Sequence, residues 1–179
     1  SVAIGDPLYR PFKVSLAEQL KFSEDSTFTA YASIRETNRI LAEEGSEPAI
    51  AYARSEFISQ PSLALAYRLA QLYASEAMDR EAVEVLKIIR FITSFSPDDF
   101  VLIQKIANFL HARGESEMAF NIYKNLLEER DLDKQLKIAL FQGGARIAVT
   151  QNEPVIASRW NLEASKLKSP PTPRPANKK

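Results

Sequence analysis

The sequence predicts an all-α fold, a right-handed α-solenoid of about four helix–turn–helix hairpins, and two internal repeats carry this prediction. Ala82, Ala119 and Ala157 recur at spacings of 37 and 38 residues, each shortly after a turn signal between two apolar helical patterns. Residues 47–51 (EPAIA) resemble residues 153–157 (EPVIA), 106 residues later. A helix–turn–helix period of roughly 34 to 40 residues is typical of stacked helical hairpins.

The chain begins with an N-terminal extension, residues 1–25. There we expect a short strand at residues 2–4, a Gly-Asp-Pro turn at residues 5–7 and a short helix at residues 14–22. The helical repeat domain follows.

The repeat domain covers residues 26–168 and is divided by helix-capping signals. Residues 96–99 (Ser-Pro-Asp-Asp) predict a helix start, with Ser96 as the N-cap and two acids at the positive end of the helix dipole. Gly114 is expected to end that helix, and Ser116 to cap the next. Pro61-Ser62 and residues 152–154 mark similar starts.

Residues 169–179 form a basic tail with four prolines, which favour an extended, disordered segment over a helix. Residues 1–165 carry 18 basic and 23 acidic residues, whereas the remainder carries five basic residues and no acid. A nucleic-acid-binding solenoid is expected to have a basic domain, so we expect no nucleic-acid partner.

Composition indicates a soluble helical chain, with 45% hydrophobic and 26% charged residues. No apolar run approaches the roughly 18 to 20 residues that cross a bilayer, and no signal peptide is visible at Ser1. With no cysteine, disulfides and thiolate metal sites are excluded, and the compartment stays open between cytoplasmic and extracytoplasmic. The chain does not begin with Met, which leaves open that it is part of a longer protein.

The repeated units resemble the tetratricopeptide repeat family. Its pattern places a large residue, a Leu, a small residue and a Tyr in the first helix of each hairpin, and Ala, an aromatic and Ala in the second. The matching residues in three successive units are Leu69, Ala70, Tyr73, Ala82 and Leu86; Ile106, Ala107, Leu110, Gly114, Ala119 and Tyr123; and Phe141, Gly144, Ala145 and Ala157. Two features depart from the pattern, because Ile89 and Leu126 replace a small residue and the units exceed the family's length.

This resemblance implies a non-catalytic adaptor that binds a peptide or protein on the concave face formed by the first helices. Matched by position, that face displays polar side chains: Tyr67, Arg68, Gln71, Gln104, Lys105, Asn108, His111, Gln142 and Arg146. Arg146 or Lys105 would be available for a carboxylate. The set lacks the family's full carboxylate clamp, and ordinary solvated helix residues are the alternative interpretation.

We expect no enzyme, cofactor or metal site. His111 is the only histidine, so a catalytic triad or a zinc site has too few candidates, and it is better explained as a groove or surface residue. Gly143-Gly144 lacks the lysine and the strand of a phosphate loop, which favours a close helix contact or a kink. The acidic clusters at residues 43–47 and 128–133 are expected on solvated faces.

Two further features concern the ends of the chain. Trp160, with Val155, Ile156 and Leu162, is expected on an exposed last face, as either a cap or a docking surface. Residues 5–12 (GDPLYRPF) resemble the last strand of the α/β domain in bacterial caspase-like and gingipain-like peptidases. This resemblance implies the alternative function, a C-terminal structural or regulatory domain of a larger bacterial protein, with secretion left open. In the other interpretation, the segment caps the first helix pair.

Overall fold

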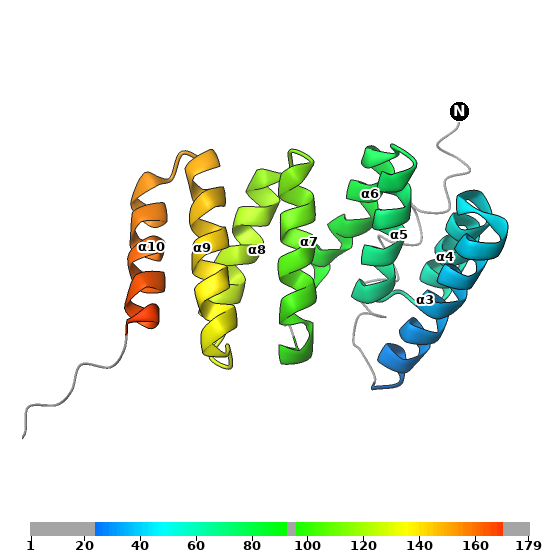
Figure 1. Ribbon diagram of the computed structural model, residues 1–179, viewed down its shortest axis with the longest axis horizontal. Helices are drawn as coiled ribbons and strands as arrows, with labels where there is room; N and C mark the ends of the chain where they lie inside the picture. The colour runs from blue at the N-terminus through cyan, green and yellow to red at the C-terminus, as the bar shows by residue number, and fades with distance from the viewer. Residues whose placement is uncertain (1–23, 93–95, 170–179) are drawn as a thin grey trace, which may run out of the picture. The chain divides into compact units, whose positions relative to one another are not determined.

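Helices make up all the regular structure of residues 24–92 and 96–169, which the computed structural model describes (Figure 1). The prediction of an all-α chain is confirmed for these residues. The predicted strand, turn and short helix of residues 2–22 and the tail from residue 170 lie outside them. The elements in order are α3 (Glu24–Glu44), α4 (Ser46–Ser59), α5 (Leu63–Ser75), α6 (Asp79–Leu86), the 3₁₀ helices η2 (Lys87–Phe91) and η3 (Pro97–Asp99), α7 (Phe100–Ala112), α8 (Ser116–Glu128), α9 (Lys134–Thr150) and α10 (Pro154–Lys168).

Helix starts follow the capping signals at most of the predicted places. The Ser62 hydroxyl accepts a hydrogen bond from the Leu65 amide at 3.1 Å and so caps α5. At residues 96–99 the chain first forms η3, and α7 begins only at Phe100. The prediction for Ser116 is wrong, because Glu115 is the N-cap of α8 and the Ser116 hydroxyl bonds to Nδ1 of His111 at 2.8 Å.

One turn conformation recurs three times between paired helices. In each case a residue with positive φ follows the first helix: Ala77 (58°), Gly114 (89°) and Asn152 (57°). The next amide then bonds to the carbonyl five residues earlier, as in Met78 to Tyr73 (2.8 Å), Glu115 to Leu110 (3.0 Å) and Glu153 to Ala148 (2.9 Å). The three turns are 37 and 38 residues apart, the same spacings as the three alanines.

The repeated alanines take one structural position, the fourth residue of the second helix. Ala82, Ala119 and Ala157 are at most 4% exposed, and Ala49 holds the same position in α4 at 0%. The alignment of residues 47–51 with residues 153–157 is therefore shifted by two. Ala51 is exposed, whereas Ala157, with which it was aligned, is buried.

The strained turn residue gives a first prediction. A left-handed conformation costs an alanine about 1–2 kcal/mol, whereas a glycine loses roughly 0.5–1 kcal/mol of extra chain entropy. Ala77→Gly should therefore raise the free energy of unfolding by about 0.5–1 kcal/mol, and Gly114→Ala should lower it by a similar amount. Urea denaturation measures both, and effects of the same sign at the two positions would contradict this account.

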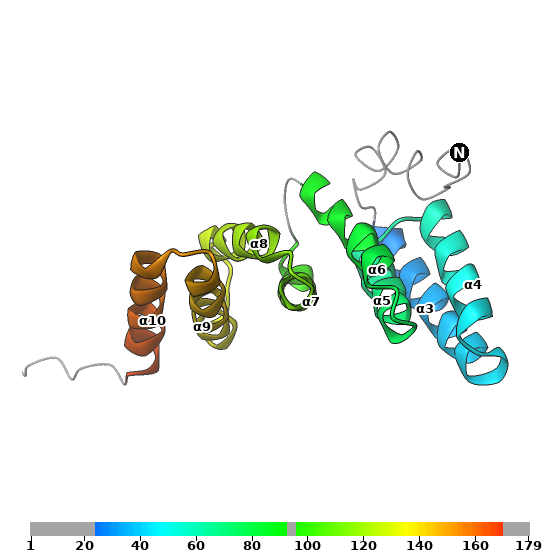
Figure 2. The ribbon, with the colours of Figure 1, turned by 90° about the horizontal axis from the view of Figure 1, so that it is seen from above.

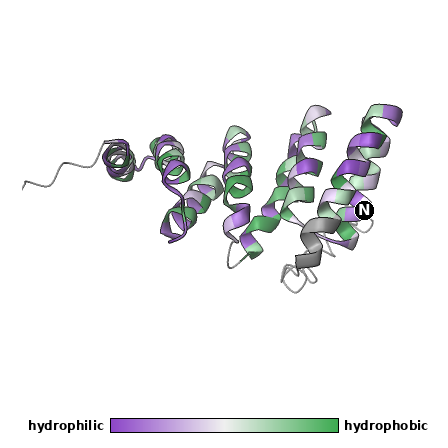
Figure 3. Cartoon of the chain, turned by 60° about the horizontal axis from the view of Figure 1, so that its bottom comes forward, coloured by the Kyte–Doolittle hydropathy of each residue, from purple (hydrophilic) through white to green (hydrophobic). Residues whose placement is uncertain are grey.

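The chain divides into two compact units, with the boundary between Ile106 and Ala107 inside α7. In the first unit, α3 pairs with α4 and α5 pairs with α6, and α5 also packs against both α3 and α4 (Figures 1 and 2). Hydrophobic and hydrophilic residues alternate along these helices (Figure 3), and the apolar ones form the core. Its fully buried large side chains are Phe57, Leu65, Leu69, Leu86, Phe100, Ile103 and Ile106.

In the second unit, α9 pairs with α10 and also packs against α8. Its core is built on aromatic side chains that meet glycines. Tyr123 of α8 is fully buried against Gly143 and Gly144 of α9, and Trp160 of α10 lies against Gly144. The two glycines therefore make the close helix contact that was one of their two predicted roles.

Candidate functional site

All nine candidate residues lie on helices that begin a hairpin. Tyr67, Arg68 and Gln71 lie on α5, Gln104, Lys105, Asn108 and His111 on α7, and Gln142 and Arg146 on α9. The boundary between the two units falls within the α7 group, so the surfaces of the two units are taken separately.

In the first unit, Arg68 joins the first helices of two successive hairpins. Its Nε donates to Oδ1 of Asn38 on α3 at 2.8 Å, and its terminal nitrogen donates to Oε1 of Gln71 at 3.5 Å. The structure thus brings Arg68 and Gln71 together, with Tyr67 half-buried beside them on α5. A guanidinium and two carboxamides are gathered at one place between α3 and α5.

Three residues of α3 were not among the candidates chosen from the sequence. Asn38 receives the Arg68 hydrogen bond, and Tyr31 and Arg35 lie on the same face of α3 at helical spacing. Tyr31 is 60% exposed, so its aromatic ring lies at the surface of α3 and not in the core. The spacing of residues 31, 35 and 38 was the signal that could have identified them.

In the second unit, two candidate residues make hydrogen bonds to other side chains of the fold. Asn108 accepts a hydrogen bond from the hydroxyl of buried Tyr123 at 2.7 Å, which ties α7 to α8. His111 contacts Ser116 at the start of α8 through Nδ1. Gln142 and Arg146 are both exposed and lie one turn apart on α9.

The remaining two candidates lie on the part of α7 that belongs to the first unit. Lys105 is exposed and Gln104 is half-buried.

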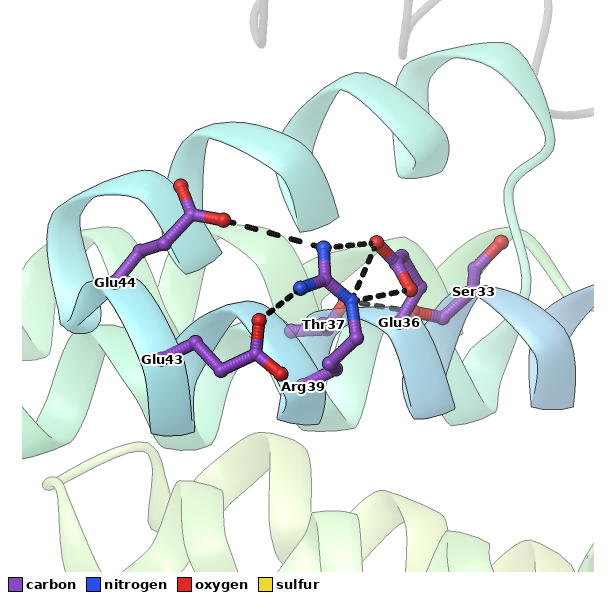
Figure 4. A network of polar contacts seen from close by, with 6 residues as sticks. All are labelled: Ser33, Glu36, Thr37, Arg39, Glu43 and Glu44. Carbon is purple, nitrogen blue, oxygen red and sulfur yellow. Dashed lines mark hydrogen bonds and ion pairs between the residues drawn. The ribbon is translucent and has the colours of Figure 1, made fainter.

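A separate polar network lies along α3 (Figure 4). Arg39 makes ion pairs with Glu36 at 2.7 Å, with Glu43, and with Glu44 at 3.9 Å. The hydrogen bonds from Arg39 to Glu36, supported by its charge, hold the pKa of that carboxyl below its ordinary value. All four residues are well exposed on one helix, so the network contributes little to stability and forms a solvated face.

Polar groups also lie between α3 and α4. The Ser33 hydroxyl donates to Oε2 of Glu56 on α4 at 2.9 Å. Within α3, the Thr37 hydroxyl donates to the Ser33 carbonyl at 2.7 Å, as Figure 4 shows. Burial, with the nearby carboxylates of Glu56 and Glu36, raises the pKa of Tyr52. These contacts fix the first hairpin and present no group for chemistry.

The expectation that Trp160 lies on an exposed last face is wrong. Its indole is only 6% exposed, and its ring centroid lies 5.7 Å from that of Phe120 on α8. It packs there because Gly144 has no side chain at the point of contact. Of the companions predicted with it, Val155 and Leu162 are exposed, at 78% and 55%, while Ile156 is half-buried.

Among the described residues, no group of three or more histidine, cysteine, aspartate or glutamate side chains is arranged to hold a metal ion. No helix in this part of the chain is both long and apolar enough to span a bilayer. The chain matches no known protein family, and no curated protein sequence is significantly similar to it.

Proposed function

We propose that the chain is a non-catalytic protein-interaction module, built as a tetratricopeptide-like α-solenoid of about four hairpins, which binds a peptide or protein segment on the face of its first helices. The observation that supports it best is the recurring turn at Ala77, Gly114 and Asn152, with a buried alanine at the same place in each following helix. A single hairpin cannot bury its apolar face alone, so a repeated hairpin implies stacking between neighbours.

The residues between α3 and α5 support binding on the first-helix side. Asn38 and Gln71 carry carboxamides, which can donate to and accept from a peptide backbone, and Arg68 lies between them. Exposed Tyr31 adds an aromatic contact of the kind enriched at protein interfaces. In the second unit, exposed Arg146 is the group suited to a carboxylate.

A peptide array probed with the labelled full chain tests this function through Arg146→Ala. We expect the mutation to weaken binding of peptides with acidic or free carboxyl-terminal groups by about tenfold, because a charge-assisted hydrogen bond contributes about 1.5–3 kcal/mol. Arg130→Ala, which removes an exposed arginine outside the helices, is the matched control and should leave the array pattern unchanged.

Asn108→Ala is a poor alternative test, because it would leave the buried Tyr123 hydroxyl without its acceptor and destabilise the fold. The proposal fails if the array yields no binder. It fails equally if binding is unchanged by Arg146→Ala together with Gln142→Ala and by Arg68→Ala together with Gln71→Ala.

A further inference from the structure

The outer face of α10 exposes two large apolar side chains. Helix α10 buries Ala157, Trp160 and Ala164 on one side. On the opposite side, Val155 is 78% exposed and Leu162 55% exposed. Residues seven apart lie almost directly above one another on an α-helix, so these two side chains form one short apolar ridge.

The corresponding face is charged in the other second helices of the repeats. With the buried alanines aligned, the positions of Val155 and Leu162 are occupied by Glu47 and Arg54 in α4, by Arg80 of α6 and Lys87 at the start of η2, and by Glu117 and Lys124 in α8. Isolated exposed apolar residues are common and need no explanation. Here the two positions are apolar together in α10 and charged in each of the other three hairpins, which points to a role specific to α10.

The whole exposed stripe of α10 has a seven-residue period. Each apolar residue is followed three positions later by a serine and four positions later by a cation. These residues, all exposed, are Val155, Ser158, Arg159, Leu162, Ser165 and Lys166. In heptad terms the apolar residues are at a, the serines at d and the cations at e, so the stripe has the seven-residue spacing of a coiled-coil seam, with serines in place of the usual apolar d residues.

We propose that this stripe is a docking seam for an amphipathic helix of another protein, one whose apolar ridge is flanked by acidic residues. Val155 and Leu162 act as knobs, and the two serines leave room for a helix to approach closely. No acid is among the six stripe residues. The nearest one, Glu163, lies beside the stripe and is paired with Lys166 at 2.8 Å. The e-position cations therefore select a partner with acidic flanking residues.

A second copy of α10 fits this seam poorly. In an antiparallel pair the e positions face each other, which would place Arg159 and Lys166 against the same cations of the other helix. In a parallel pair the two cations would face Pro154 and Asn161, neither of which carries a charge. The charge pattern therefore favours a different chain as the partner.

A membrane surface fits poorly as well. Helices that lie in the lipid interface present a broad apolar face with Trp, Phe or Leu. The α10 stripe has only two large apolar residues with serines between them, and Trp160 is buried on the opposite side. A narrow ridge with flanking cations suits a single helix.

Two synthetic helical peptides test the proposal against the full chain by fluorescence anisotropy. They share leucines at a and d, and carry either glutamate or lysine at e and g. We expect the glutamate peptide to bind at least about tenfold more tightly. Leu162→Ser should weaken its binding by about tenfold or more, and Arg159→Glu, which leaves one cation and one acid at the e positions, should abolish the preference between the peptides.

Arg130→Glu is the control, with the same charge change at an exposed site away from α10, and should have no effect. Circular dichroism should show that each variant is folded, as expected for substitutions of exposed residues. The proposal is overturned if the peptides bind equally, if neither binds, or if Leu162→Ser changes nothing. Binding to anionic vesicles without peptide binding would assign a membrane surface, and self-association lost in Leu162→Ser would assign a second copy. Arg146→Ala should leave peptide binding by α10 intact, so this test is independent of the proposed first-helix site.

Discussion

Trp160→Ala is expected to lower the free energy of unfolding by about 3–5 kcal/mol, the range for removing a large aromatic side chain from a core. The indole is 6% exposed, stacks at a tilt on Phe120 and fills the space that Gly144 leaves on α9. Its removal would leave a cavity where α8, α9 and α10 meet. Urea denaturation followed by far-UV circular dichroism measures the loss, since Trp160 is the only tryptophan and its fluorescence disappears with it.

Leu162→Ala is the matched control, because Leu162 lies on the same helix but is 55% exposed. It should cost no more than about 0.5 kcal/mol, as surface substitutions usually do. A similar loss for the two variants would mean that the indole is not buried as described. A large loss for Trp160 alone would also remove it from consideration as a docking residue.

The parts of the fold that were predictable from the sequence are those that depend on local chemistry. Gly114 marks a helix end because glycine adopts positive φ at no steric cost, and Ser62 caps a helix through its own hydroxyl. The spacing of the alanines located the second helices because a small residue is needed wherever two helices approach closely. Each of these signals can be recognised within a few residues.

The incorrect predictions involve contacts between residues that are distant in the chain or that compete with each other. Ser116 has the side chain of an N-cap, but His111 offers its hydroxyl a partner from the preceding helix. Trp160 was expected at the surface because its site depends on Gly144, a whole helix away in sequence. The similarity of residues 47–51 to 153–157 hid a shift of two positions, which only the burial of Ala49 reveals.

For the candidate binding residues, too, the local pattern was predictable and the contacts between helices were not. Matching the repeats by position to the tetratricopeptide pattern predicted which side of α5, α7 and α9 would carry these polar groups. It could not show that Asn108 accepts a hydrogen bond from Tyr123, or that Arg68 reaches Asn38 on α3. Both contacts join different helices, so their existence depends on how the helices pack.

Gly144→Val is expected to lower the free energy of unfolding by about 3 kcal/mol or more, at the upper end of the cost of overpacking a core. A Cβ atom at this position would lie 2.8 Å from Cζ3 of Trp160 and 3.2 Å from Cδ1 of Tyr123. Neither ring can move away easily, since Tyr123 is fully buried and its hydroxyl is bonded to Asn108. Gln142→Val, at an exposed position of the same helix, should show only the few tenths of a kcal/mol that valine costs an α-helix.

Combining the two core substitutions separates steric conflict from general damage to α9. In Trp160→Ala/Gly144→Val the valine would occupy part of the space that the indole vacates, so the double variant should be more stable than the sum of the single effects by about 1–3 kcal/mol. Strict additivity would contradict direct contact between the two positions. Positive coupling would show that the glycine is required because the tryptophan occupies the space beside it, so that the fit between α9 and α10 depends on a pair of residues 16 apart in the chain.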